Sequence, residues 1–285
     1  MRTLTGEARL AGVIGWPVAH SRSPRLHGFW LERMGIDGAY VPLPVRPGDF
    51  EPAVRGLLAA GFRGGNVTLP HKQAAFAICD ARDDAARRAG AVNTLVFEGG
   101  KILGRNTDGP GFVANLRAHG IDPAAGPAQV LGAGGAARAV AAALLDAGAA
   151  VSITNRTPER AEALARALPA LRAGTGVRVL PWAQREAALA DHALVVNTTS
   201  AGMAGHDALP LDLAKAPERL AVADIVYVPL QTKLLAAAAA RGLRCAGGLG
   251  MLLHQAGLGF EAWFGVRPEV DAELEAHVAA DIPKQ

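Results

Sequence analysis

A run of glycines in the middle of the chain constrains the fold more than any other segment. Residues 130–138 read Val-Leu-Gly-Ala-Gly-Gly-Ala-Ala-Arg, after an apolar strand-like run and before an alanine-rich helical pattern. Gly132 would allow a tight turn, Gly134 would let the backbone approach a pyrophosphate, and Ala137 would let the helix pack closely on the strand. The helix N-terminus would then face an anion. The pattern predicts a dinucleotide-binding turn, with a plain glycine-rich connection as the alternative.

The next expected strand, residues 150–154, indicates which dinucleotide would bind. It is followed by Asn155-Arg156-Thr157, about 20 residues beyond the glycines, where NAD enzymes usually carry an acidic residue for the ribose 2′-hydroxyl. Arg156 stands here instead, and a guanidinium group suits a 2′-phosphate. The same residues could form a simple helix cap, with Thr157 as N-cap and Pro158 as the first helical residue. Both roles are compatible, and the segment favours NADP over NAD.

The composition excludes several classes of protein. The chain has 285 residues, of which 50% are hydrophobic and 19% charged, so it can fold into two domains and is too apolar to be disordered. Its net charge of +3 includes no basic cluster interleaved with aromatic residues, which argues against nucleic-acid binding. No apolar run reaches the roughly 18 residues of a membrane span, and the N-terminus lacks a signal-peptide layout.

The cysteines indicate a reducing compartment. Cys79 and Cys245 lie far apart and fit no metal-ligand spacing, so buried thiols are expected. We therefore expect a cytoplasmic protein without a metal, whose partner is a small molecule rather than nucleic acid or a membrane. The sequence leaves a homodimer open.

Strands and helices are expected to alternate along the whole chain. In the first part, strands are predicted at residues 10–15, 39–45, 63–69, 91–97 and 101–104, and helices at 24–34, 49–60 and 108–119, with helical segments up to residue 88. In the second part, strands are predicted at 128–131, 150–154, 177–180, 193–197, 221–225 and 243–246, and helices at 249–264 and 269–280. This alternation predicts an α/β protein with two lobes and a cleft between them, where ligands usually bind.

Polar residues follow two of the expected strands. Ser21 and Ser23 place two hydroxyls beside a helix N-terminus, which favours a carboxylate or phosphate, although Ser23 could be an ordinary N-cap. Lys72 follows the strand that carries Thr68 and ends before Pro70. Its ammonium group could act as a general acid or base or hold a substrate oxygen, or it could be a solvated surface group.

Other candidates lie within or before expected helices and strands. Asn93 could belong to a buried hydrogen-bond relay or contact a substrate. Asp108 could cap the helix that joins the two domains, or it could face Lys72 across the cleft. Met251 and Gln255 lie on an apolar helix and could be core residues, although the Met251 thioether would also suit a nicotinamide ring.

Taken together, these segments resemble the shikimate dehydrogenase family. The motifs that carry the resemblance are G-x-P-V-x-H-S-x-S-P, N-V-T-x-P-x-K, G-A-V-N-T, N-T-D-G, G-A-G-G-A-x-R-A, N-R-T, N-T-T-S-x-G-M, Y-x-P-x-x-T and G-x-G-M-L-x-x-Q-A, in that order from residue 12 to residue 256. The resemblance implies NADPH-dependent, reversible reduction of 3-dehydroshikimate to shikimate in the aromatic amino-acid pathway. It also implies a substrate domain at 1–107, completed by 245–285, and a Rossmann-like NADP-binding domain at 108–244.

The resemblance implies roles for individual positions. Lys72 would be the catalytic acid or base, paired with Asp108. The substrate would be bound at its carboxylate by Ser21 and Ser23 and at its ring hydroxyls by Thr68, Asn93, Asp108 and Gln255, with Tyr227 nearby. The cofactor would be bound by Gly132, Ala133, Gly134, Gly135, Ala136, Asn155, Arg156, Thr157, Ile225, Gly248 and Met251, and by Asp84, which matches more loosely.

One departure from the family pattern is visible, and two alternatives stay open. The family usually has His-Asn after the serine motif, whereas this chain has His27-Gly28; that side chain is expected to point away from the substrate. A quinate/shikimate dehydrogenase with relaxed use of NAD and NADP is disfavoured by Arg156, together with the retained serines and Thr68. A non-catalytic NADP-binding regulator would be expected to lose Lys72 or Asp108.

Overall fold

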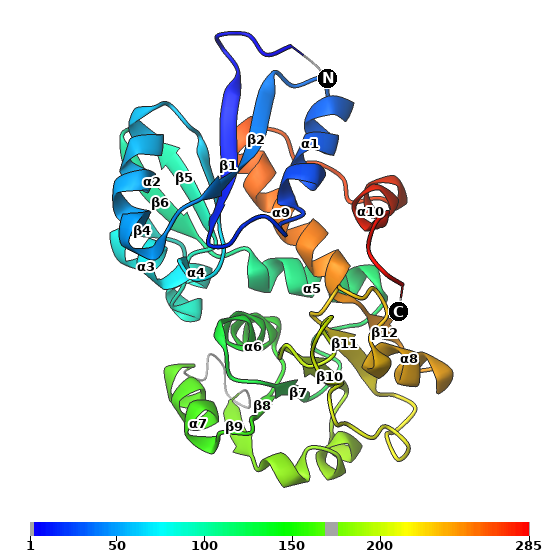
Figure 1. Cartoon of the computed structure of the whole chain (residues 1–285). Helices are drawn as coiled ribbons and strands as arrows, with labels where there is room; N and C mark the ends of the chain where they lie inside the picture. The colour runs from blue at the N-terminus through cyan, green and yellow to red at the C-terminus, as the bar shows by residue number, and fades with distance from the viewer. Residues whose placement is uncertain (1–2, 169–175, 285) are drawn as a thin grey trace. The chain divides into compact units, whose positions relative to one another are not determined.

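The computed structural model of the chain describes residues 3–168 and 176–284, which form two compact units (Figure 1). Unit 1 comprises Met1–Thr107 and Gln255–Ala280, and unit 2 comprises Asp108–His254 and Asp281–Gln285. One break falls at the start of helix α5 (Asp108–Ala118) and another falls within helix α9 (Gly248–Phe264). The predicted domains, 1–107 completed by 245–285 and 108–244, stay a prediction, and their residues 1, 2, 169–175 and 285 lie outside the described part.

Unit 1 is built on a mixed sheet of six strands with the order β2-β1-β3-β5-β6-β4. The strands are β1 (Arg9–Gly15), β2 (Gly38–Pro44), β3 (Gly64–Val67), β4 (Ala81–Arg82), β5 (Thr94–Glu98) and β6 (Lys101–Arg105). β1 pairs in parallel with β2 and β3, whereas β5 is antiparallel to both β3 and β6. Gly99 and Gly100 join β5 to β6 with φ of 57° and 74°, the left-handed conformation that a two-residue hairpin loop requires. The predicted hairpin is confirmed.

The helices of unit 1 pack on its sheet and on one another through apolar side chains. They are α1 (Ser23–Arg33), α2 (Phe50–Ala59), α3 (Lys72–Ile78), α4 (Asp84–Ala89), residues 255–264 of α9, and α10 (Ala272–Ala279), which packs on α1, with a 3-10 turn at Pro47–Asp49. One core cluster joins Ile14 and Leu95 of the sheet to Val54 of α2 and Ala75 of α3. The burial of such side chains is the main favourable term in the folding of this unit.

Two predicted strands of unit 1 are shorter in the structure than the sequence suggests. The predicted strand 63–69 ends at Val67, and the predicted strand 91–97 begins only at Thr94. Before Thr94, the Val92 N donates to the Lys72 O at 3.0 Å, a partner outside the sheet. The short strand β4 lies where helical segments were expected, because two residues carry no detectable period.

Unit 2 contains six parallel strands with the order β12-β11-β10-β7-β8-β9. They are β7 (Ala128–Leu131), β8 (Val151–Thr154), β9 (Val177–Leu180), β10 (Leu194–Asn197), β11 (Ala221–Asp224) and β12 (Cys245–Ala246). All lie where strands were predicted. Read from the other edge, the order is β9-β8-β7-β10-β11-β12, which is that of a dinucleotide-binding sheet. From β7 the chain adds strands toward β9 on one side, and then from β10 toward β12 on the other side, so the order reverses between β7 and β10. Ligands bind outside the carboxyl ends of the strands at such a switch point.

Alternating side chains of this sheet enter two separate apolar cores. Val130 and Val196 pack in a cluster with residues of α5, α6 (Gly135–Ala147) and α7 (Pro158–Ala167). Leu131 follows Val130 on β7, and Val195 precedes Val196 on β10. Both pack in a second cluster with α8 (Lys233–Ala240). Short 3-10 turns at Trp182–Gln184 and Ala187–Asp191 lie between β9 and β10. The sheet of unit 2 is therefore buried on both faces, as parallel sheets usually are.

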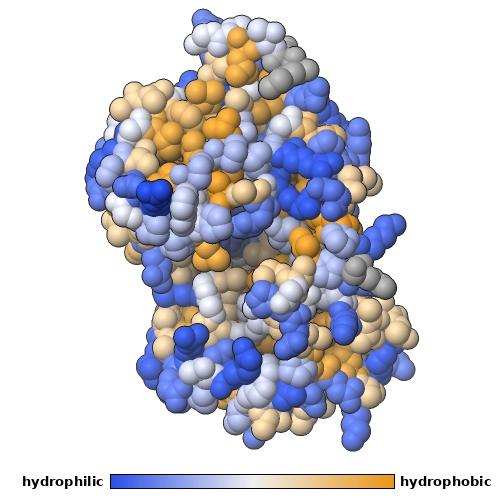
Figure 2. Space-filling model, in the orientation of Figure 1, coloured by the Kyte–Doolittle hydropathy of each residue, from blue (hydrophilic) through white to orange (hydrophobic). Residues whose placement is uncertain are grey.

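The surface of the described residues is mixed in character. Figure 2 shows hydrophilic and hydrophobic residues interspersed on the face in view. Within residues 3–168 and 176–284, no helix has the length and apolar character needed to cross a membrane.

Close packing of β1 on β3 predicts opposite effects for two glycine-to-alanine changes. A Cβ at Gly65 would lie 2.5 Å from the backbone O of Gly12, so Gly65→Ala must displace backbone. We expect its free energy of unfolding to fall by about 1–3 kcal/mol. Gly56→Ala, on the exposed side of α2 where a Cβ meets nothing within 4 Å, should raise it by up to about 1 kcal/mol. Urea unfolding followed by circular dichroism measures both, and equal stabilities would contradict the packing argument.

Candidate functional site

Unit 1 holds a buried cluster of polar side chains centred on Asn93. The Thr107 N donates to the Asn93 Oδ1 at 2.8 Å, and the Asn93 Nδ2 donates to the Thr107 Oγ1 at 3.0 Å. The Gln255 Oε1 accepts from the Thr107 Oγ1 at 3.1 Å and from the Asn93 Nδ2 at 3.4 Å. Such mutual bonding fixes the orientation of buried amides. The structure thus brings together two predicted substrate-binding residues, Asn93 and Gln255, which are 162 positions apart.

The cluster extends to Asn66, which the sequence analysis did not select as a site residue. The Tyr40 hydroxyl donates to the Asn66 Oδ1 at 2.6 Å, and the Asn66 Nδ2 donates to the Thr94 Oγ1 at 3.3 Å. Burial raises the pKa of Tyr40 well above its ordinary value, so the hydroxyl stays a donor at neutral pH. The available signal was an amide within a strand that is otherwise apolar or glycine, on the same face as Thr68.

Lys72 begins helix α3 and is half-buried. Its backbone O accepts from the Val92 N at 3.0 Å, one residue before Asn93. The preceding residue, His71, is buried; its Nε2 lies 2.7 Å from the Val45 O, and its ring stacks on Phe50. These contacts hold the segment that presents Lys72. They would have been hard to find from sequence, because His71 carries no periodic signal.

Asp108 begins helix α5 and directly follows Thr107, a member of the Asn93 cluster. Lys72 and Asp108 are thus each linked through backbone to the neighbourhood of Asn93. The catalytic pairing of their side chains stays a prediction.

The serine motif differs from its prediction in one respect. Ser23 was expected as a possible N-cap, but it is the first residue of α1, and no side chain caps this helix. Instead the Ser21 Oγ accepts from the Ser23 N at 3.3 Å. Pro24, predicted as the first residue of the helix, is the second; it still lies in the first turn, where its missing N–H would have no helical partner. Ser23 itself is buried and hydrogen-bonds to Tyr40.

The position of Gly28, where the chain departs from the family pattern, has space for a larger side chain. No atom lies within 4 Å of the position that a Cβ on Gly28 would take, so a longer side chain there would not displace its neighbours. His27 is fully buried and stacks on Tyr40 with ring centroids 4.0 Å apart. Burial lowers the pKa of His27 to about 3, against a smaller opposing effect of Asn66, and the ring is therefore neutral.

In unit 2, the glycine turn after β7 has the geometry of an anion site. Gly132 has φ of 114°, and a Cβ on it would lie 2.7 Å from the Thr198 Oγ1, so only glycine fits. At Gly134 and Gly135 a Cβ would meet nothing within 4 Å, and the first turn of α6 contains no acidic residue. Open space and helix amides suit a pyrophosphate. The predicted close packing of Ala137 is confirmed, since it is fully buried in the core.

The turn after β8 presents Arg156 to solvent. The Asn155 Nδ2 donates to the Thr157 O at 2.8 Å and closes the turn, and Arg156 is exposed. Thr157 occupies the N-cap position of α7 and Pro158 its first turn, as predicted, but the Thr157 hydroxyl makes no capping hydrogen bond. An exposed guanidinium at this point fits a 2′-phosphate.

The first turn of α9 is pressed against the end of β11. A Cβ on Gly248 would lie 2.2 Å from the Ile225 O, so this glycine permits the close approach. Ile225 and Met251 both pack against the core of unit 2 while remaining partly exposed, which is compatible with either role considered for Met251. Asp84, the loosest match, is an exposed residue of unit 1 that forms an ion pair with Arg87. Its contact with a cofactor stays a prediction.

Asp224, at the end of β11, is a buried acid that the sequence analysis passed over. Its Oδ1 accepts from the Asn197 Nδ2 at 2.9 Å and from the Val226 N at 3.0 Å, and its Oδ2 accepts from the Thr232 Oγ1 at 2.8 Å. Burial raises the pKa of Asp224 to about 6, although these hydrogen bonds oppose the shift. The signal available in the sequence was an acidic residue that ends an apolar strand.

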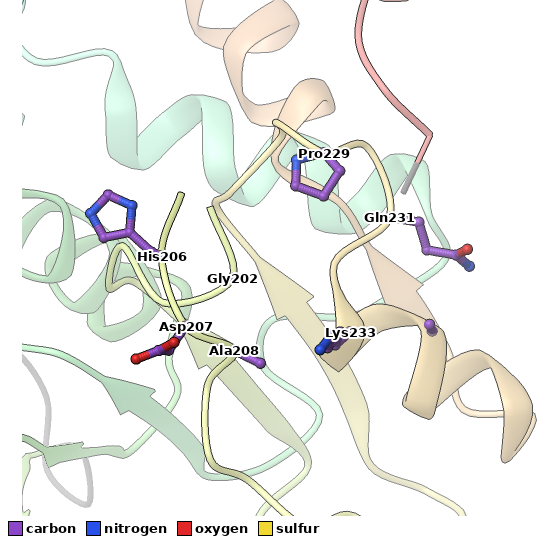
Figure 3. Close-up of a pocket in the computed structure, with 8 residues that line it drawn as sticks. Gly202, His206, Asp207, Ala208, Pro229, Gln231 and Lys233 are labelled. Carbon is purple, nitrogen blue, oxygen red and sulfur yellow. The ribbon is translucent and has the colours of Figure 1, made fainter. Parts of the chain in front are cut away.

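A cavity of about 520 Å³ lies beside these loops of unit 2. It is lined by Gly202, His206, Asp207, Ala208, Pro229, Gln231, Lys233 and Ala236 (Figure 3). In Figure 3 the side chains of His206 and Gln231 lie on opposite sides of the view and do not converge. Over the described ranges, no group of three or more His, Cys, Asp or Glu side chains is placed to hold a metal ion.

Three sequence models of one family match the chain in order. The substrate binding domain of shikimate dehydrogenase matches residues 13–95, shikimate / quinate 5-dehydrogenase matches residues 122–204, and the C-terminal domain of shikimate 5′-dehydrogenase matches residues 248–276.

Curated relatives agree with this match. The chain is 68% identical to shikimate dehydrogenase (NADP(+)) of Acidiphilium cryptum, over 98% of this chain and 99% of the relative. It is 57% identical to the same enzyme of Paramagnetospirillum magneticum, over 96% and 99%.

Solved structures share the fold at full length. Shikimate 5-dehydrogenase from Thermus thermophilus, in complex with NADP(H) and shikimate, has a TM-score of 0.84 and 42% identity, covering 95% of this chain and 98% of that one. Quinate dehydrogenase from Corynebacterium glutamicum, in complex with NAD, has a TM-score of 0.89 and 30% identity, covering 96% and 99%. The α/β fold with a Rossmann-like sheet is thereby confirmed, and the chain belongs to the shikimate dehydrogenase family.

Proposed function

We propose that this chain catalyses the reversible, NADPH-dependent reduction of 3-dehydroshikimate to shikimate, a step of the aromatic amino-acid pathway. The single observation that carries the proposal is the buried cluster that joins Asn93 to Gln255 next to the backbone of Lys72. A cluster of amides and hydroxyls with fixed orientations suits a ligand with several ring hydroxyls. Relatives that cover nearly the whole chain carry the name of this activity.

The substrate is held at two ends in this proposal. Ser21 and Ser23 would bind its carboxylate at the start of α1, where helix amides also favour a negative group. Thr68, Asn93 and Gln255 would bind the ring hydroxyls, and Tyr227 would lie nearby. Fixing both ends sets the position of the carbonyl that reacts.

The proton and the hydride take separate routes. When bound, NADPH would supply a hydride for the carbonyl carbon, and negative charge would then develop on the carbonyl oxygen. The Lys72 ammonium group would stabilise this developing charge or donate a proton to it, which completes the alcohol. Asp108 would orient Lys72 and a substrate hydroxyl, and either member of the pair could supply the proton.

The residues of unit 2 fit the cofactor by their own geometry. The open glycine turn at Gly132–Ala136 would hold the pyrophosphate, and Asn155, Arg156 and Thr157 would hold the 2′-phosphate. Ile225, Gly248 and Met251 would contact the nicotinamide, and Asp84, a residue of unit 1, would make a further contact.

We also propose a cytoplasmic location and small-molecule partners alone, without nucleic acid or a membrane surface. Both cysteines are free thiols, and burial raises the pKa of Cys79 to about 11, so it stays a protonated thiol. The sequence leaves a homodimer open, and light scattering, which measures the mass of the protein in solution, tests it.

Initial rates of shikimate oxidation at alkaline pH test the proposed activity. NADP and NAD are compared as oxidants, and quinate is compared with shikimate as substrate. Turnover of shikimate with NADP alone is the expected result. Equal or better use of quinate or NAD would assign the chain to the relaxed branch, and well-folded protein that binds NADPH without turnover would be a regulator.

Lys72→Met should remove most of the turnover without weakening substrate binding to the same degree. The variant keeps the length of the side chain and loses its charge and protons, so we expect kcat to fall by about 10²–10⁴-fold with a smaller change in KM for shikimate. Lys101→Met, on the exposed hairpin of unit 1, is the matched control and should match the wild type. An unchanged kcat in folded Lys72→Met would remove Lys72 from the mechanism.

Arg156→Ala should change cofactor preference rather than turnover in general. Loss of the guanidinium removes contacts that only the 2′-phosphate makes, so we expect kcat/KM for NADP to fall by about 10–100-fold while the value for NAD stays within about twofold. Arg166→Ala, at the exposed end of α7, is the matched control. Parallel losses with both cofactors would show that Arg156 does not read the 2′-phosphate.

A further inference from the structure

The loops that follow β10 and β11 are bonded to each other at their bases. Asn197 ends β10 and Asp224 ends β11, and the Asn197 Nδ2 donates to the Asp224 Oδ1 at 2.9 Å. Further along, the Ile225 N donates to the Asn197 O at 3.1 Å, and the Ala204 N donates to the Val228 O at 2.9 Å. The two loops therefore hold one common arrangement.

Each of the two side chains also orders its own loop. The Asn197 Oδ1 accepts from the Thr199 N at 3.0 Å and from the Thr199 Oγ1 at 2.7 Å, and its Nδ2 donates to the Ala201 O at 3.0 Å. Asp224 reaches the start of α8 through Thr232. Asn197 is 0% and Asp224 2% exposed, so water cannot replace a lost partner.

We propose that Asp224 and Asn197 are positioning residues for the nicotinamide end of the cofactor, because they hold the loops after β10 and β11 in the arrangement that hydride transfer requires. The inference rests on the proposed function, in which Ile225 and Tyr227 on the second loop contact cofactor and substrate. In this proposal neither positioning residue contacts the cofactor or the substrate. Both act through the backbone that they hold.

Ionisation of the buried Asp224 carboxyl costs the folded protein some stability. Because its pKa in the folded protein lies near 6, above that of an ordinary aspartate, stability falls as the pH rises toward that value. A neutral asparagine of the same size would avoid this loss. The carboxylate offers acceptors on both oxygens, which receive donors from Asn197, Val226 and Thr232. An asparagine keeps only one acceptor oxygen, which would weaken the join between the two loops.

The test compares the two ends of the cofactor. Adenosine 2′,5′-bisphosphate carries the 2′-phosphate but no nicotinamide, so it reports on the turns after β7 and β8 alone. We expect Asp224→Ala to lower kcat for shikimate oxidation on the order of 100-fold and to weaken NADPH binding in calorimetry. Its affinity for adenosine 2′,5′-bisphosphate should stay within about twofold of the wild type. Asp224→Asn, which keeps one acceptor, should lie between the wild type and Asp224→Ala in kcat.

Controls separate a positioning role from damage to the fold. Asp212 accepts from the Ala214 N at 2.8 Å in an exposed turn of the same unit, and Asp212→Ala should change none of these quantities. If Asp224→Ala does not fold, Thr199→Val replaces it, since this change removes one hydroxyl, which donates to the Asn197 Oδ1 and accepts from the Ala201 N of the same loop. It should lower kcat and NADPH affinity while sparing the affinity for the bisphosphate.

Two outcomes would overturn the positioning role. One is an unchanged kcat in folded Asp224→Ala, and the other is an equal loss of affinity for NADPH and for the bisphosphate. A wild-type protein that binds NADPH but does not oxidise shikimate would contradict the proposed function instead. In that case the ratio of the two affinities would still test whether Asp224 positions the nicotinamide end.

Discussion

Buried amide and hydroxyl groups that must all find partners decide the form of the site in unit 1. Asn93 is 3% exposed and satisfies both ends of its amide through Thr107 and Gln255. A buried polar group left without a partner costs about 1–3 kcal/mol, so the chain cannot place these residues independently. Thr107 and Gln255 are held where Asn93 needs them. Asn93 and Gln255, which are hydrogen-bonded to each other in the folded chain, are also proposed to bind the substrate.

Unit 2 solves a different problem, the approach of a charged ligand to the backbone. Parallel strands end at the same edge of the sheet, and reversal of the strand order between β7 and β10 leaves space there. Gly132 is required because Thr198 on the neighbouring loop occupies the place of a side chain. Further along, Gly134 and Gly135 leave their surroundings open. Residues 132–135 therefore combine close packing at Gly132 with open space at Gly134 and Gly135.

Asp224 shows how a residue can serve a site and oppose stability at once. Its burial disfavours the ionised form, yet ionisation gives the most acceptors for the donors around it. Residues that break a local rule in this way are often found at functional sites, with compensation elsewhere in the structure. Here the compensation comes from Asn197 and Thr232, which are buried and directed at the carboxylate.

The sequence by itself determined the six strands of unit 2, the glycine turn and the hairpin at Gly99-Gly100, because these depend on short-range periodicity and on backbone conformations of single residues. Only the tertiary structure joined Asn93 to Gln255, added Asn66 to the same cluster, and showed that Ser23 begins α1 instead of capping it. It also revealed the role of Asp224 as a shared acceptor. The physical reason is that hydrogen bonds between distant residues depend on strand order and helix packing, which no local pattern encodes.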